Sequence, residues 1–220
     1  MTLEDELAKR RELVRQVSSA ADNRTLEDEI ARLQMLQLAE TSLQVGDMLP
    51  DLALPDVDGT LHRCDELLAR APLVLWFFRG AWCPYCDVAL ALVERARPAI
   101  EAAGGFVVGI CPERPELVRQ TAIVERGVRF LLLVDQDSAY ARLCGLRWET
   151  SDANAAMLDR LGVNLPERQG VDAWALPVPA TYIVDAGGII RFAYANADWT
   201  RRASPEHVVA FLESMRQAGS

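Results

Sequence analysis

The chain has 220 residues, a length that indicates one main domain. Its 23 basic and 32 acidic side chains give a formal charge of −9 at pH 7, which argues against a nucleic acid as partner. Half of the residues are hydrophobic and a quarter are charged, so the chain can bury a core and intrinsic disorder is not expected.

No membrane segment or export signal is visible. Apolar runs such as Leu73 to Phe78 and Phe130 to Val134 are far shorter than the roughly 18 residues that a spanning helix needs. The first residues are charged, with no basic stretch followed by an apolar one, so we expect a cytoplasmic protein with no membrane partner. The chain has five cysteines, which are Cys64, Cys83, Cys86, Cys111 and Cys144. This number is odd, and a chain of this size needs no disulfide framework, so we do not expect one.

Residues 1–44 are predicted to form a helical arm ahead of a domain over 45–220. Apolar side chains recur at helical spacing in two stripes, and each helix is expected to open at a Thr-Leu-Glu-Asp-Glu segment, at Thr2 and at Thr25. The stripes fit burial on the same chain equally well as burial in a homodimer. They are Leu3, Leu7, Val14 and Val17, then Leu26, Ile30, Leu33 and Leu36.

The domain is predicted to be α/β. After a hairpin over 49–62 that turns at Asp58-Gly59, strands over 72–78, 106–111 and 130–134 alternate with helices over 84–100 and 116–125. This βαβαβ order predicts a parallel sheet covered by helices. A short helix ends at Gly145, and residues 146–176 carry no clear pattern. Strands over 181–184 and 189–194 then flank a turn, and Ser204 and Pro205 open a final helix.

The sequence Trp82-Cys83-Pro84-Tyr85-Cys86 carries the chemistry. It follows the buried strand and opens a helix, where free backbone amides and the positive end of the helix dipole stabilise thiolates. Cys83 is expected near the helix cap and exposed, with Cys86 one turn further on and more shielded. Two cysteines at this spacing can form a reversible disulfide.

A zinc site is the alternative for this motif. A lone Cys-x-x-Cys can be half of such a site, and His62 and Cys64 could supply the other two ligands. The remaining cysteines, Cys111 and Cys144, are expected to be buried as small hydrophobic residues. His207 lies in the first turn of the last helix, where exposure to solvent is expected, so no histidine is assigned as a general acid.

The order of strand, Cys-x-x-Cys, helix, strand and Pro179-Ala-Thr181 before a hairpin and a terminal helix resembles the thioredoxin fold. Over residues 45–217 the chain is most similar to the peroxiredoxin-like branch of the alkyl hydroperoxide reductase and thiol-specific antioxidant (AhpC/TSA) family, with 77–86 as the most specific part. The resemblance implies a central mixed sheet flanked by helices. It also matches Pro179, in preference to Pro177, to the cis-proline of thioredoxin-like proteins.

The motif departs from the family pattern Pro-x-x-x-Thr-x-x-Cys. Counting back from Cys86 places Arg79 at the proline and Cys83 at the threonine, so only Cys86 matches, as the peroxidatic cysteine. The family's second arginine falls at Pro179, which leaves the peroxide-activating set incomplete. Thioredoxin-type exchange would instead use Cys83 as the attacking thiolate and Cys86 as the resolving thiol, and all its matching residues are present.

The expected function is a thiol-dependent oxidoreductase. The family resemblance favours reduction of peroxides through a reversible Cys83–Cys86 disulfide, whereas the local residues favour a protein disulfide reductase with Cys83 as nucleophile. Arg79 either adds positive potential beside the thiolate or is a solvent-exposed strand-end residue, and Trp82 packs beside the site. We expect no cofactor and an external thiol reductant, of thioredoxin or glutathione type.

Overall fold

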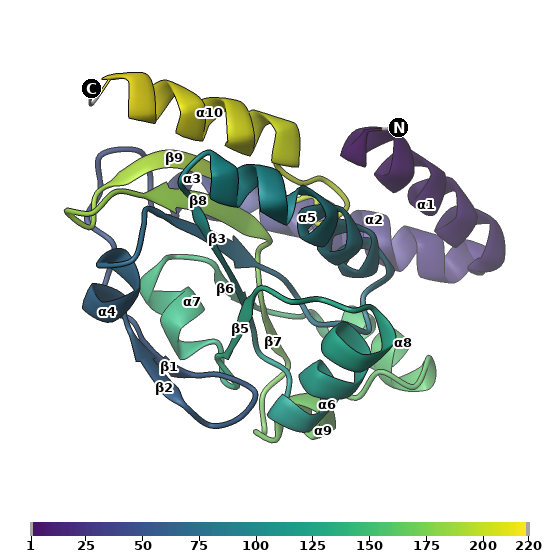
Figure 1. The fold of residues 1–220 in the computed structure, drawn as a ribbon. Helices are drawn as coiled ribbons and strands as arrows, with labels where there is room; N and C mark the ends of the chain where they lie inside the picture. The colour runs from purple at the N-terminus through teal and green to yellow at the C-terminus, as the bar shows by residue number, and fades with distance from the viewer. Residues whose placement is uncertain (1, 219–220) are drawn as a thin grey trace.

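A five-stranded mixed sheet forms the centre of the protein. The computed structural model describes residues 2–218, and the strand order of this sheet is β5-β4-β3-β8-β9 (Figure 1). The three strands of the predicted βαβαβ unit pair in parallel with one another. The last two strands of the chain complete the sheet, and each is antiparallel to the strands beside it. The strands are β3 (Leu73–Phe77), β4 (Phe106–Cys111), β5 (Leu131–Val134), β8 (Ala180–Val184) and β9 (Ile190–Ala195). The predicted α/β class is therefore confirmed.

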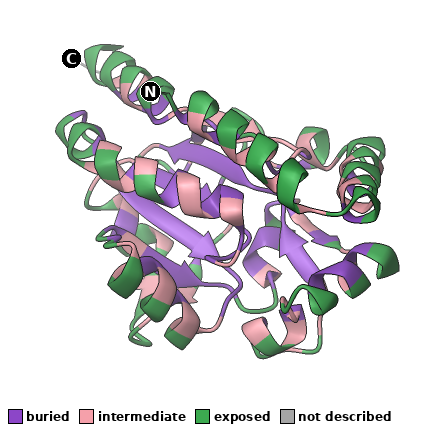
Figure 2. Ribbon diagram, turned by 90° about the vertical axis from the view of Figure 1, so that its right-hand side faces the viewer, coloured by how far each residue is buried: buried purple, intermediate pink, exposed green. Residues whose placement is uncertain are grey.

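Strand β3 is apolar at every position because it is enclosed on all sides. Its five side chains are all buried, and Leu75 pairs with Val108 on one edge and with Tyr182 on the other. Figure 2 shows the central strands buried while the surrounding helices carry the exposed residues. A loop of five residues, 78–82, connects this buried strand to Cys83, so the motif lies close to the centre of the sheet.

Helices cover both faces of the sheet (Figure 1). On one side, α5 (Pro84–Ala102) packs against α10 (Pro205–Ala218). On the other, Tyr140 of α7 (Ala139–Leu143) stacks on Phe77 of β3 with ring centroids 6.2 Å apart. The crossover between β4 and β5 is α6 (Pro115–Val118) followed by a π-helical segment, η1 (Arg119–Glu125), instead of one regular helix over 116–125. Within residues 2–218, no helix has both the length and the apolar character required to cross a bilayer.

Short elements fill the segments between these layers. The predicted hairpin is confirmed as β1 (Ala53–Pro55) paired with β2 (Leu61–Arg63) and followed by α4 (Cys64–Leu68). The segment without a clear pattern, 146–176, folds as a second hairpin-like pair that encloses two helices. These elements are β6 (Arg147–Glu149), α8 (Asp152–Arg160), α9 (Leu165–Gln169) and β7 (Ala175–Pro177). Elements of three to nine residues are too short to establish a hydrophobic period.

The N-terminal arm consists of α1 (Leu3–Val17), α2 (Ala20–Met35) and the single turn α3 (Leu38–Thr41). Thr2 and Asp5 form the predicted capping box of α1. The predicted start of the second helix at Thr25 is wrong. Ser19 caps α2 instead, accepting from the backbone N–H of Asp22, and the Thr25 hydroxyl donates to the Ala21 carbonyl inside the helix. A serine cap therefore starts the helix earlier, since no glycine or proline lies between residues 19 and 25.

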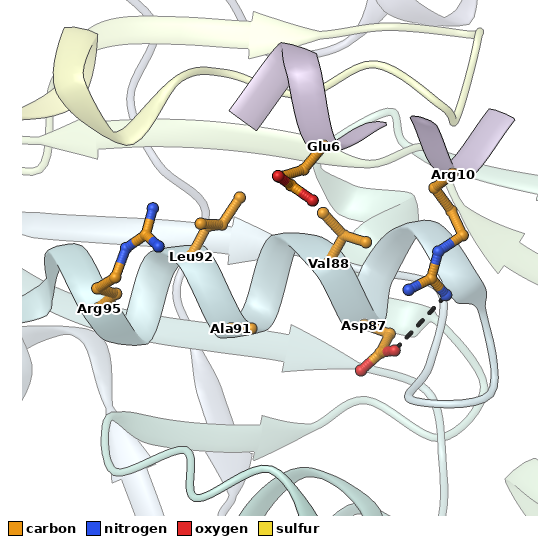
Figure 3. Close-up of a pocket in the computed structure, with 7 residues that line it drawn as sticks. All are labelled: Glu6, Arg10, Asp87, Val88, Ala91, Leu92 and Arg95. Atoms are coloured by element: carbon orange, nitrogen blue, oxygen red, sulfur yellow. Dashed lines mark ion pairs between the residues drawn. The ribbon is translucent and has the colours of Figure 1, made fainter. Parts of the chain in front are cut away.

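The arm packs on its own chain. Helix α1 lies against α5, and α2 lies against α8. At the first contact, Arg10 of α1 pairs with Asp87 of α5 at 3.7 Å beside a hollow of about 380 Å³ between the two helices (Figure 3). At the second contact, Asp22 of α2 pairs with Arg160 of α8. These contacts bring the arm over the start of α5, where the Cys-x-x-Cys motif lies.

Candidate active site

The two cysteines of the motif lie at the N-terminal end of α5. Cys83 is the N-cap residue, and Pro84 occupies the first helical position, as the sequence predicts. Cys86 lies in the first turn. Backbone amides near a helix N-terminus lack intrahelical acceptors, so negative charge on sulfur is stabilised at this point of the chain.

Both cysteines are buried. Only 1% of Cys83 and none of Cys86 is exposed, and all five cysteines of the chain are free thiols. The predicted exposure of Cys83 is wrong, because α1, α2 and the end of α8 contribute side chains to the wall of a cavity that encloses it. Cys111 and Cys144 are buried as predicted.

Two buried arginines face the two sulfurs. Nη1 of Arg79 donates toward the Cys83 sulfur at 4.0 Å, and Nη2 of Arg202 donates to the Cys86 sulfur at 3.4 Å. The guanidinium of Arg79 also lies between two indole rings, 5.0 Å from the centroid of Trp82 and 4.4 Å from that of Trp199. The sequence left open whether Arg79 adds positive potential beside the thiolate or is exposed to solvent. It is buried, with its charge beside Cys83.

The surroundings of the two cysteines lower the pKa of one and raise the pKa of the other. Burial alone raises the pKa of Cys83, but a hydrogen bond with Cys86 and the charges of Arg79 and Arg202 outweigh it and lower the pKa to about 5. Burial, the same hydrogen bond and the negative charge on Cys83 raise the pKa of Cys86 well above its ordinary value. At neutral pH the pair therefore holds one thiolate, at Cys83, and one thiol, at Cys86.

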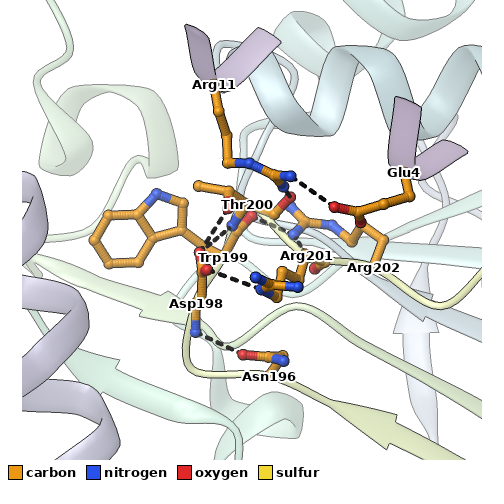
Figure 4. Close-up of polar contacts among 8 residues, drawn as sticks. All are labelled: Glu4, Arg11, Asn196, Asp198, Trp199, Thr200, Arg201 and Arg202. Carbon is orange, nitrogen blue, oxygen red and sulfur yellow. Dashed lines mark hydrogen bonds and ion pairs between the residues drawn. The ribbon is translucent and has the colours of Figure 1, made fainter. Parts of the chain in front are cut away.

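Arg202 is a site residue that sequence reasoning missed, as are Trp199 and Glu113. Arg202 lies 116 residues after Cys86 in a loop that follows β9, and no local motif marks it. Polar contacts hold this loop in place (Figure 4). Asp198 accepts from the backbone N–H of Thr200 at 3.0 Å, and Arg11 of α1 donates to the Thr200 carbonyl at 3.3 Å. Arg202 itself donates to the carbonyls of Trp199 and Arg201, which directs its other nitrogen to the sulfur.

A buried carboxylate fixes the loop before Cys83. Glu113, two residues after the end of β4, is fully buried and accepts from the backbone N–H of Ala81 at 2.5 Å. Its other oxygen accepts a hydrogen bond from Nε of Arg168 of α9 at 2.7 Å and forms an ion pair with Nη2 of the same arginine, also at 2.7 Å. Gly80 has φ +139°, and a Cβ there would lie 2.5 Å from the indole nitrogen of Trp82 and 2.9 Å from the Glu113 carboxyl carbon. Only glycine fits this position without displacing its neighbours.

A cavity of about 150 Å³ lies beside Cys83 and is separate from the hollow between α1 and α5. Cys86 is not among the residues that line it. One part of its wall comes from the motif and its surroundings, and the other from the arm and the α8 region. The first part is Arg79, Trp82, Cys83, Pro84, Tyr85 and Trp199, and the second is Val14, Ser18, Asp22, Leu26, Met157, Leu158, Leu161 and Val163.

The prediction of a cis-proline at Pro179 is wrong. Every peptide bond within residues 2–218 is trans. The chain is tied on both sides of Pro179, because the N–H of Val178 donates to the Leu146 carbonyl and Ala180 pairs with Phe77. It therefore continues extended from β7 into β8. Pro179 is buried there and is not among the residues that line the cavity.

The four-ligand zinc alternative is also wrong. His62 on β2 pairs with Asp56 at 2.9 Å, and Cys64 opens α4, whereas Cys83 and Cys86 open α5. Across the described part of the chain, no three His, Cys, Asp or Glu side chains are close enough to share a metal ion. His207 is exposed, as predicted.

Comparison with known proteins identifies the family. The model of the AhpC/TSA family matches residues 45–193. The chain belongs to the AhpC/TSA family. The resemblance seen in the sequence is thereby confirmed, and the 44-residue arm lies outside the matched span.

The relatives of this AhpC/TSA member are named peroxiredoxins and thiol-disulfide oxidoreductases. Peroxiredoxin Bcp of Escherichia coli is 30% identical over 109 residues, which are 50% of this chain and 69% of that protein. Peroxiredoxin bcp1 of Schizosaccharomyces pombe is 34% identical over 71 residues, which are 32% of this chain but only 36% of that protein. The thiol-disulfide oxidoreductase ResA of Geobacillus thermodenitrificans is 20% identical over 152 residues, 69% of this chain and 70% of that protein.

The solved structures agree on the fold. The structure of peroxidoxin BcpB from Mycobacterium tuberculosis superimposes with a TM-score of 0.61 at 20% identity, and covers 79% of this chain and 99% of that one. The family and its named relatives confirm the expected enzyme class, a thiol peroxidase or thiol-disulfide oxidoreductase.

Proposed function

We propose that this protein reduces peroxides, with Cys83 as the attacking thiolate and Cys86 as the resolving thiol. The observation that carries the proposal is the asymmetry of the pair: Cys83 has the lowered pKa and lines the cavity, whereas Cys86 has the raised pKa and does not line it. Peroxide and thiolate can meet only where the thiolate can be reached. This assignment differs from the family pattern, which matches Cys86 to the peroxidatic cysteine.

In the first step, the Cys83 thiolate attacks the terminal oxygen of the peroxide. A sulfur–oxygen bond forms, the O–O bond breaks, and the leaving alkoxide or hydroxide takes up a proton as alcohol or water. Cys83 becomes a sulfenic acid. Arg79 and Arg202 support this step because their charges keep Cys83 ionised at neutral pH, and the buried Nε–H of Arg79 has no hydrogen-bond acceptor among residues 2–218.

In the second step, Cys86 resolves the sulfenic acid. Its sulfur attacks the Cys83 sulfur, hydroxide leaves and combines with the Cys86 proton as water, and a Cys83–Cys86 disulfide forms. The hydrogen bond that the Cys86 thiol donates to the Cys83 thiolate before the reaction favours this step, since it places the two sulfurs next to each other. Two thiol equivalents from an external reductant, of thioredoxin or glutathione type, then restore the pair.

Reduction of protein disulfides is the second candidate. The same polarised pair would serve it, with Cys83 attacking a substrate sulfur and Cys86 releasing the mixed disulfide. The size of the cavity argues for a peroxide. A cavity of about 150 Å³ beside a cysteine that is 1% exposed admits a small molecule more readily than a disulfide in another protein.

The assignment predicts opposite outcomes for the two serine variants. We expect the reduced protein to lose two thiols per equivalent of peroxide, much faster than free cysteine does. Cys83→Ser should abolish the reaction, whereas Cys86→Ser should still react and accumulate a sulfenic acid that dimedone traps at Cys83. Stopped-flow kinetics and mass spectrometry measure both results.

Three outcomes would contradict the proposal. A rate no greater than that of free cysteine would exclude the peroxidase, and retained reactivity in Cys83→Ser would transfer the attack to Cys86. Efficient reduction of insulin disulfides without a peroxide reaction would favour the second candidate. Cys144→Ser is the matched control, because Cys144 is equally buried but lines no part of the cavity.

A further inference from the structure

Two chemically different groups of side chains line the cavity beside Cys83. The first is Cys83 with Arg79 and Trp82, whose Nε–H and Nε1–H groups find no acceptor among the described residues. The second is a set of apolar side chains from α1, α2 and the α8 region: Val14, Leu26, Met157, Leu158, Leu161 and Val163. Asp22 is the only acidic residue in the wall, and Arg160 and Ser19 already satisfy its carboxylate.

The apolar side chains of the wall have no part in sulfur chemistry. Water alone would gain nothing from these six apolar side chains, because an apolar surface offers it no hydrogen bonds. An apolar group carried by the substrate would bury its surface there and leave its reactive oxygens beside Cys83 and Arg79. The polarity of the cavity therefore fits a molecule with one polar and one apolar end.

Contacts between the arm and the rest of the chain hold this wall in place. Glu29 of α2 accepts from the backbone N–H of Ser151 at 2.8 Å, and Arg32 donates to the Glu149 carbonyl at 2.6 Å. These bonds join α2 to the start of α8, and the Asp22–Arg160 pair joins them at the other end. A wall fixed at both ends gives the cavity a defined size.

We propose that the N-terminal arm and α8 form a size-limiting pocket for the apolar group of an organic hydroperoxide, with Leu26 as a specificity-determining residue. An apolar cavity of 150 Å³ holds a molecule of about the size of benzene. The pocket therefore accepts substituents of about four to seven carbon atoms and excludes long acyl chains. This inference rests on the proposed peroxidase function and assigns substrate selection to a segment outside the matched family span.

The test changes the volume of the pocket at one position. Rates are measured for Leu26→Ala and Leu26→Trp with hydrogen peroxide, tert-butyl, cumene and linoleic acid hydroperoxides. Leu26→Ala is expected to raise the ratio of the linoleic acid hydroperoxide rate to the hydrogen peroxide rate about tenfold, and Leu26→Trp to lower the ratio of the tert-butyl hydroperoxide rate to the hydrogen peroxide rate about tenfold. Leu13→Ala is the matched control, because Leu13 lies on α1 and is 52% exposed; its ratios should equal those of the unchanged protein.

A second readout separates the pocket from the peroxidase. Alkylation of Cys83 by iodoacetamide and by the bulky fluorescein maleimide, located by fragment mass spectrometry, reports access without any peroxide. If peroxidase activity is absent but the ratio of the two alkylation rates follows the size of residue 26, the pocket stands and the proposed function fails. If both Leu26 variants fold, as circular dichroism shows, and leave the peroxide and alkylation ratios unchanged, the pocket is overturned.

Discussion

Arg202 lies beside Cys86, but its charge also stabilises the thiolate of Cys83. It and Arg79 are both buried. An opposite charge within a few ångströms lowers the pKa of an acidic group by about one to three pH units. The rate at which Cys83 reacts should therefore depend on pH in a way that Arg202 controls.

We predict a rate of Cys83 alkylation that rises with pH around pH 5 and is constant near neutrality, because the pKa of Cys83 is lowered to about 5 and only the thiolate reacts. Arg202→Met removes the charge but keeps the length of the side chain. The midpoint of the profile should then move upward by about one pH unit or more, so the rate at pH 5.5 should fall several-fold. Iodoacetamide kinetics from pH 4 to 9 measure the shift.

Arg201→Met provides the control for this profile. Arg201 is the neighbouring residue in the same loop, is exposed, and pairs with Asp198 at 3.3 Å. An unchanged midpoint in Arg202→Met, or an equal shift in both variants, would remove Arg202 from the electrostatics of the site.

Among the elements, α9 has an unexpected connection to the site. Its Arg168 neutralises Glu113, which in turn holds the Ala81 amide in the loop before Cys83. Burial raises the pKa of Glu113, and Arg168 opposes that rise. Without the arginine, a buried carboxylate would be left without its cationic partner, which is costly in free energy.

Arg168→Met is expected to lower the free energy of unfolding at pH 7 by about 3 kcal/mol. In the variant the folded-state pKa of Glu113 should rise further above its unfolded value, so its folded form binds a proton more readily than its unfolded form does. Stability relative to the unchanged protein is then regained as pH falls and lost as pH rises. Urea unfolding at pH 5 and pH 7 tests this sign: a deficit that is larger at pH 5 contradicts it. Arg114→Met is the control, because it also changes an arginine to methionine but removes an ion pair with Glu116, which is exposed.

The sequence predicted most elements of the domain, because strands such as 106–111 and 130–134 are apolar over their whole length and the caps at Thr2 and Pro84 act locally. It also predicted, from local signals, that Cys83 and Cys86 lie together at the start of α5. It could not supply Arg202, which only the folded chain brings to Cys86, nor the burial of Cys83, which results from the docking of distant helices. The cis form of Pro179 was carried over from a resemblance and not from a local signal.

At the scale of the whole molecule, the arm and the domain share one site. Helix α2 is joined to α8 partly by the ion pair between Asp22 and Arg160, and both helices line the cavity. An ion pair with one exposed partner contributes up to about 1 kcal/mol to stability. This corresponds to about a fivefold change in the equilibrium by which the arm moves away from α8. Breaking it should expose Cys83 slightly more often.

Arg160→Ala is therefore expected to raise the alkylation rate of Cys83 by fluorescein maleimide about two- to fivefold, with a smaller effect on iodoacetamide. Arg15→Ala is the control, because it removes an ion pair with Glu12 that lies within α1. Equal rates in Arg160→Ala and the unchanged protein would mean that this ion pair does not restrict movement of the arm. Peptide-resolved mass spectrometry provides the rates.

In the proposed site, the reactive groups and one part of the selecting wall lie in different stretches of the chain. The sulfurs, Arg79 and Arg202 lie between residues 79 and 202, whereas Val14 and Leu26 belong to the first 44 residues. We expect that changing the bulk of Val14 and Leu26 alters which molecules enter, while Arg11 keeps the loop of Arg202 in place. This would offer a division for engineering, in which preference among oxidants is tuned in the first 44 residues and turnover between residues 79 and 202.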